Sequence, residues 1–128
     1  MPGRKATSTY SINEKHIINC NLTYAIHIIE GRWKLMIIDK LEQKRMRFSE
    51  LKTEFAHITE RMLSLQLRTM EQDGLIKRTI YPEVPPRVEY ELTTMALELT
   101  PILNQLSKWA AKNRKTPFTE IIEVDKIS

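Results

Sequence analysis

Apolar positions in the first part of the chain recur at helical spacing. Residues 22–30 carry Leu22, Ile26 and Ile29 at spacings of 4 and 3. Gly31 follows, where the end of a helix favours a left-handed residue. Residues 32–41 repeat the pattern, with an apolar side made of Trp33, Met36, Ile37 and Leu41. The pattern predicts two short helices separated by the glycine, followed by a polar turn at 42–45.

The next stretch predicts two helices joined by a tight connection. Phe48, Leu51 and Phe55 mark a short helix that is capped by Ser49 or starts just before it. Thr59 then stands where a helix N-cap is expected. In the helix that follows, one side is apolar and suited to the core, with Leu63, Leu67 and Met70. The opposite side is available to a ligand and carries Arg61, Ser64, Leu65 and Arg68. This arrangement indicates a helix-turn-helix.

The spacing changes from helical to strand-like after Gly74, which closes that helix. Residues 76–81 and 88–92 are two short β-patterned runs. Between them, Pro82, Pro85 and Pro86 stiffen the connection and prevent ladder pairing there. We expect a β-hairpin in the position of a wing.

From Thr93 the spacing is helical again. The apolar seam is spaced 4, 3, 4, 3 and consists of Met95, Leu99, Ile102, Leu106 and Trp109. Pro101 lies within this stripe and predicts a kink, since the apolar register continues across it. The stripe suits packing on its own domain or on a two-fold partner. Because a small core cannot cover so long an apolar helix, we expect a homodimer that also uses Leu22, Ile26 and Ile29.

The predicted fold is mainly α with a small β-hairpin wing, that is, an α+β winged helix-turn-helix dimerising through N- and C-terminal helices. A chain of 128 residues has room for one domain with a modest core. We expect a flexible N-terminal arm at 1–15, the winged helix-turn-helix domain at 16–114 and a C-terminal tail at 115–128.

Composition narrows the class of protein. The net charge of +4 favours a polyanionic partner weakly. The single cysteine, Cys20, cannot form an intrachain disulfide, which fits a reducing compartment. No apolar run approaches the roughly 18 residues that span a bilayer, and the first 15 residues lack the apolar segment of a secretory signal. We expect a cytoplasmic protein with no membrane partner.

Enzymatic chemistry finds little support. The three histidines have no metal-ligand spacing, and the three glycines cannot form a phosphate-cradling loop. A nucleophilic pair of Cys20 with a histidine needs a pocket for which the sequence gives no signal. We therefore predict no enzyme activity, no cofactor and no metal.

The chain resembles the HxlR-type bacterial transcriptional regulators, relatives of the MarR-type winged helices. The resemblance covers roughly residues 20–109 and rests on motifs in a specific order. They are Cys20 before a short helix, Gly31-Arg32-Trp33-Lys34, Arg47-Phe48-Ser49-Glu50-Leu51, Arg61-Met62-Leu63 through Leu67-Arg68, Asp73-Gly74-Leu75, Tyr81-Pro82-Glu83-Val84-Pro85-Pro86-Arg87-Val88-Glu89-Tyr90 and Leu92-Thr93. It implies a homodimer that binds an operator near the genes it controls. It also implies an electrophile- or oxidant-sensing role for Cys20, against which stands simple packing of a buried thiol.

A double-stranded, pseudo-palindromic DNA operator is the partner that we expect. The candidate DNA-binding residues are Arg47, Ser49, Thr59, Arg61, Ser64, Leu65, Arg68, Lys77 and Arg87. Arg61 suits either a guanine edge or a phosphate. Arg87 suits either the minor groove or a salt bridge to Glu83 or Glu89. The alternative function is a winged-helix protein-interaction module without specific DNA binding. The sequence names neither the inducing signal nor a small-molecule effector.

Overall fold

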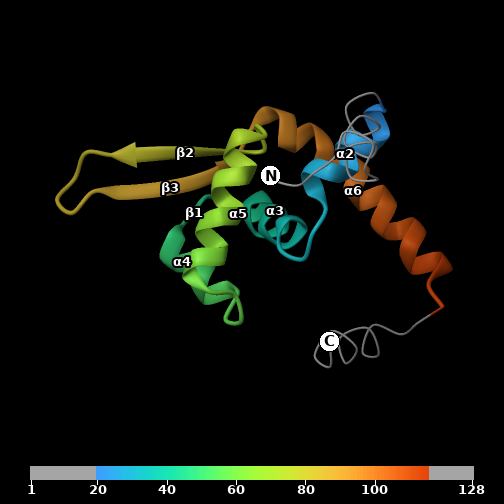
Figure 1. Ribbon diagram of the computed structural model, residues 1–128, viewed down its shortest axis with the longest axis horizontal. Helices are drawn as coiled ribbons and strands as arrows, with labels where there is room; N and C mark the ends of the chain where they lie inside the picture. The colour runs from blue at the N-terminus through green and yellow to red at the C-terminus, as the bar shows by residue number, and fades with distance from the viewer. Residues whose placement is uncertain (1–19, 116–128) are drawn as a thin grey trace, which may run out of the picture. The chain divides into compact units, whose positions relative to one another are not determined.

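The computed structural model describes residues 20–115, and Figure 1 shows their helices and strands. The expected arm at 1–15 and nearly all of the expected tail at 115–128 lie outside the described residues. The chain divides into two compact units between Ala96 and Leu97, inside the last helix. The elements in chain order are α2 (Asn21–Ile29), α3 (Lys34–Gln43), β1 (Met46–Arg47), α4 (Phe48–Glu54), α5 (Glu60–Gln72), β2 (Ile76–Tyr81), β3 (Arg87–Leu92) and α6 (Thr94–Asn113).

Local chemistry explains where the helices begin and end. The Thr59 hydroxyl accepts a hydrogen bond of 3.0 Å from the Met62 N–H, so Thr59 caps α5 as predicted. Arg47 rather than Ser49 is the N-cap of α4, and its N–H donates to Glu50 Oε1 at 2.9 Å. Gly31 and Gly74 follow α2 and α5 with φ of +107° and +83°, backbone angles that residues other than glycine rarely adopt. The expected helix over 32–41 is the helix α3, shifted by two residues toward the C-terminus.

The core is built from one side of each helix in the first unit. Its largest fully buried side chains are Ile37, Leu51, Leu63, Leu67, Met70, Leu75 and Ile76. Burying an aliphatic side chain of this kind stabilises a fold by about 1.5–3 kcal/mol. The α5 residues predicted for the core are confirmed. Met36, assigned to the apolar side of α3, is exposed, and Ile38 is buried instead.

The hairpin of β2 and β3, with its turn at 82–86, is confirmed, and we call it the wing (Figure 1). A third strand, β1, was not predicted. It pairs antiparallel with β3, giving the sheet order β1-β3-β2. Because β1 leads directly into α4, the sheet joins the wing to the helix-turn-helix. Within the first unit α3 and α4 also contact β3, and α5 contacts β2.

Helix α6 contains Pro101, whose ring nitrogen has no hydrogen for the Leu97 carbonyl. The Thr100 hydroxyl donates to that carbonyl at 3.0 Å instead. The helix therefore continues across the proline, and the kink expected there stays a prediction. Among residues 20–115, no helix is long and apolar enough to cross a membrane.

Candidate nucleic-acid interface

The outward side of α5 is a polar and cationic surface. Arg61, Ser64, Leu65 and Arg68 are all exposed, at spacings that place them on one side of the helix. Thr59, exposed at the N-cap, lies at the end where free backbone amides favour an anion. Arg61 and Arg68 make no hydrogen bond or ion pair with any residue of the described part. Their guanidinium groups are therefore available to a ligand.

The start of α4 adds two exposed candidates. The backbone of Arg47 pairs with the side chain of Glu50, while its guanidinium has no acidic partner among residues 20–115. Ser49 is exposed, and its hydroxyl makes no hydrogen bond with any residue of the described part. Arg47 as N-cap and Ser49 in the first turn lie at the start of α4, the first helix of the helix-turn-helix, which typically crosses the phosphate backbone.

The basic residues of β2 are paired with glutamates, unlike those of α5. Lys77 Nζ lies 3.2 Å from Glu91 Oε1 on the neighbouring strand, where the two residues are register partners. Arg78 Nε lies 3.8 Å from Glu71 Oε2 on α5. Arg78 is thus paired with an acidic residue of α5. Lys77 is still exposed, but its charge is compensated locally.

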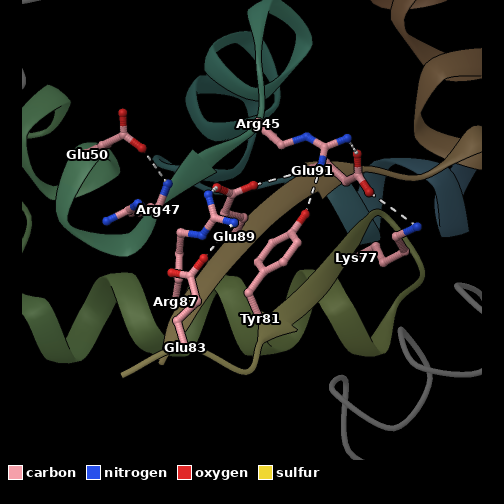
Figure 2. A network of polar contacts seen from close by, with 9 residues as sticks. All are labelled: Arg45, Arg47, Glu50, Lys77, Tyr81, Glu83, Arg87, Glu89 and Glu91. Carbon is pink, nitrogen blue, oxygen red and sulfur yellow. Dashed lines mark hydrogen bonds and ion pairs between the residues drawn. The ribbon is translucent and has the colours of Figure 1, made fainter. Parts of the chain in front are cut away.

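Arg87 is held inside the wing (Figure 2). Its Nη2 lies 3.2 Å from Glu83 Oε1, and its Nη1 donates to Glu89 Oε2 at 3.1 Å. The guanidinium carbon lies 4.1 Å from the centroid of the Tyr81 ring. Of the two interpretations of Arg87, the structure contains the salt bridge, to both glutamates at once. The charge of Arg87 is therefore compensated within the wing.

Arg45 also contacts the polar side chains of the wing, although it was not among the residues predicted for the site. Its guanidinium donates to the Tyr81 hydroxyl at 3.0 Å and lies 3.8 Å from Glu89 and 3.3 Å from Glu91 (Figure 2). The only sequence signal is a basic residue in a turn. Its partners follow from the pairing of β1 with β3, which was not predicted.

The residues predicted for a dimer interface are mostly exposed in the single chain. Leu22 is 72% exposed, and Ile26 and Met95 are nearly half exposed. On α6, Ile102, Leu106 and Trp109 are more than half exposed, whereas Leu99 is intermediate. Ile29 differs, because at 6% exposure it belongs to the core and presents no surface.

Cys20 is the N-cap of α2 and is partly exposed. Hydrogen bonds from the Thr23 side chain and backbone, and from the Leu22 backbone, lower the pKa of the Cys20 thiol, outweighing the opposing effect of burial. The thiolate form is therefore more accessible than in an ordinary cysteine. Within the described residues, no group of three or more His, Cys, Asp or Glu side chains could hold a metal ion.

Comparison with known proteins adds the following. A family model described as HxlR-like helix-turn-helix matches residues 28–117. An uncharacterised helix-turn-helix-type transcriptional regulator of Halalkalibacterium halodurans is 45% identical over 106 residues, covering 82% of this chain and 94% of the relative. The redox regulator HypR in its reduced form superposes with a TM-score of 0.70 at 38% identity, covering 75% of this chain and 95% of that one. Reduced YodB, a transcriptional regulator of Bacillus subtilis, has the same TM-score and coverage at 28% identity.

Proposed function

We propose that this chain, which belongs to the HxlR-like helix-turn-helix family of transcriptional regulators, binds a pseudo-palindromic DNA operator as a homodimer through α5. The observation that carries the proposal is the contrast in charge pairing. Arg61 and Arg68 on α5 have no acidic partner in the described part, whereas Lys77, Arg78 and Arg87 of the wing are all paired. The unpaired charge marks the surface that a polyanion contacts.

Each exposed α5 side chain predicted to contact DNA has a role in this proposal. Arg61, in the first turn, reads a guanine edge or clamps a phosphate. Leu65, an apolar residue on a polar surface, contacts a thymine methyl group. Ser64 and Arg68 extend the contact along the major groove of the DNA. Thr59 places the N-terminus of the helix near the phosphate backbone of the DNA. Arg47 and Ser49 hold phosphates beside them.

A two-fold dimer supplies the second α5 helix. The proposed interface consists of Leu22, Ile26, Met95, Leu99, Ile102, Leu106 and Trp109, without the buried Ile29. Since each α5 must meet the same side of the duplex, the half-sites lie about 10 bp apart or a multiple of that. The proposed activity is binding, and no residue is assigned a catalytic role.

Cys20 is the proposed sensor of an oxidant or electrophile. Support comes from its lowered pKa, its partial exposure and the similarity of the chain to the redox regulator HypR. Alkylation, a sulfenic acid or a disulfide to the other subunit would change the structure at the start of α2, which belongs to the proposed interface. DNA affinity then depends on the state of the thiol.

The test is selection of genomic fragments by the purified full chain, followed by sequencing and footprinting. Binding should fall log-linearly with salt, because phosphate contacts release counterions. Arg61→Ala and Arg68→Ala should each weaken binding, whereas Lys108→Ala on α6, the same loss of one positive charge, should change it little. Absence of binding at low salt would favour the alternative, a protein-interaction module.

A further inference from the structure

Four side chains, two of which flank the wing turn at 82–86, close a circuit of polar contacts (Figure 2). Arg45 Nη1 donates to the Tyr81 hydroxyl at 3.0 Å and lies 3.8 Å from Glu89 Oε1. Glu89 Oε2 accepts from Arg87 Nη1 at 3.1 Å, and the Arg87 guanidinium stacks on the Tyr81 ring at 4.1 Å. Each residue contacts two of the others. We call Arg45, Tyr81, Arg87 and Glu89 the polar ring.

The polar ring connects three parts of the first unit. Arg45 immediately precedes β1, which leads into α4. Tyr81 ends β2 and is the register partner of Arg87, at the start of β3. Glu89, also on β3, is the register partner of Arg47 on β1. The ring therefore ties both strands of the wing to the segment that begins the helix-turn-helix.

Glu89 is the centre of the polar ring. Its side chain is only 14% exposed and lies between the two arginines. Ion pairs that are shielded from water and organised as a network couple more strongly than isolated surface pairs. The carboxylate of Glu89 thus depends on both cations, and both cations are oriented by it.

The surroundings of the polar ring cancel its charge. Glu83 pairs with Arg87, and Glu91 pairs with both Arg45 and Lys77. The cluster therefore contains three cationic side chains, Arg45, Lys77 and Arg87, and three carboxylates, Glu83, Glu89 and Glu91. Both terminal nitrogens of Arg87 contact carboxylates, and its Nε is buried without a partner. Each terminal nitrogen of Arg87 therefore already has a carboxylate partner within the wing.

From this geometry we infer that the polar ring is a positioning device. It fixes the angle of the wing to the helix-turn-helix, and it affects DNA affinity through that geometry and not through its charge. Arg87 and Arg45 are accordingly positioning residues, and Glu89 increases DNA affinity although it is acidic. This inference rests on the proposed function.

Glu89→Gln separates an effect of geometry from an effect of charge, because the two predict opposite changes in DNA affinity. Loss of a negative charge alone should strengthen binding to a polyanion. Loss of the centre of the polar ring should weaken it, by about threefold to tenfold, with the wild-type salt slope retained. The matched control is Glu42→Gln on α3, an exposed carboxylate with no ion pair among residues 20–115, for which affinity should stay equal or rise slightly.

Two further variants guard against simple misfolding. Tyr81→Phe keeps the aromatic ring under Arg87 and removes only the hydroxyl that accepts from Arg45. It should therefore weaken DNA binding, but less than Glu89→Gln does. Arg45→Lys should bind DNA more weakly than the wild type, although it keeps the positive charge. An ammonium group cannot contact Tyr81, Glu89 and Glu91 together as a planar guanidinium does. Amide exchange in the free protein should quicken at β1 and β3 in Glu89→Gln.

The outcomes separate the two proposals. Affinity of Glu89→Gln that matches or exceeds that of Glu42→Gln overturns the inference while leaving DNA binding intact. A salt slope reduced by about one in Arg87→Ala also overturns it, since that result assigns Arg87 to a phosphate. A wild-type chain that binds no genomic fragment overturns the proposed function, and the role in DNA affinity with it. Unchanged amide exchange in Glu89→Gln would then also refute positioning of the wing.

Discussion

Thr93 and Gly74 are joined by a hydrogen bond of 2.6 Å from the threonine hydroxyl to the glycine carbonyl. The same hydroxyl oxygen accepts from the Ala96 N–H at 3.2 Å, as an N-cap does. One side chain thus caps the start of α6 and satisfies the carbonyl just beyond the end of α5. The contact links the last helix to the exit of the proposed recognition helix.

Replacing Thr93 by valine should lower the free energy of unfolding by about 1 kcal/mol, because both hydrogen bonds are lost while the shape is kept. Thr93→Ser retains the hydroxyl and should lose less. Urea denaturation followed by circular dichroism measures both variants. A Thr93→Val variant as stable as the wild type would contradict the contribution of the hydroxyl.

Gly74→Ala should destabilise the fold by about 1–2 kcal/mol, since φ at this position is +83°. An added Cβ would lie 3.4 Å from Met95 Cε, which is an ordinary contact, so the cost is conformational and not steric. It should therefore persist in a Met95→Ala background. Relief of the loss by that second change, measured by urea denaturation, would point to a clash.

Periodicity made most of the fold predictable. The helices and the wing follow from spacings of 3.6 and 2 residues, which local sequence displays directly. Strand β1 escaped because its two residues, Met46 and Arg47, are too few to show a period, and they pair with Glu89 and Tyr90 far along the chain. The burial of Ile38 in place of Met36 depends on which neighbours α3 meets, which a helical pattern does not specify.

The candidate site was predictable only where local helical geometry defines it. The exposed side of α5 follows from helical geometry alone. The polar ring does not, because Arg45 and Tyr81 are 36 residues apart and meet only through the sheet. Arg87 was assigned a choice between DNA and glutamate from its position near the wing turn. The glutamates at 83 and 89 gave a signal for the pairing, but not for pairing with both.

Arg61→Ala should cost roughly 1–3 kcal/mol of operator affinity and change the sequence preference, if the arginine reads a guanine edge. Arg61→Lys should keep the salt slope and lose the preference, because an ammonium cannot bond O6 and N7 as a bidentate fork. Binding selections with each variant test this. A uniform loss on all sequences, with a salt slope reduced by about one, would make Arg61 a phosphate contact.

Trp109→Glu on α6 should convert the proposed dimer to a monomer, because it places a charge in an apolar interface. Trp109 is 64% exposed in the single chain, so the change should leave the monomer fold intact. Sedimentation at micromolar concentration measures the mass, and circular dichroism checks the helices. A wild-type monomer at that concentration would contradict the dimer itself, whereas a dimeric variant would move the interface away from Trp109.

The Cys20 thiol should react with iodoacetamide faster at neutral pH than an ordinary thiol. Hydrogen bonds from Thr23 lower its pKa, so the thiolate fraction is larger at pH 7, and the rate should rise with pH and level off below the ordinary thiol range. Thr23→Val removes the side-chain donor, which should raise the pKa and slow the reaction at pH 7. Cys20→Ser supplies the background rate.

Diamide then tests whether that reactivity regulates binding. Treatment should change the operator affinity of the wild type and leave Cys20→Ser unaffected, because the serine cannot form a disulfide or a sulfenic acid. Thr23→Val should respond more slowly, in proportion to its alkylation rate. An affinity that diamide does not alter in the wild type, despite rapid alkylation, would separate a reactive thiol from a regulatory one and make Cys20 a cap residue only.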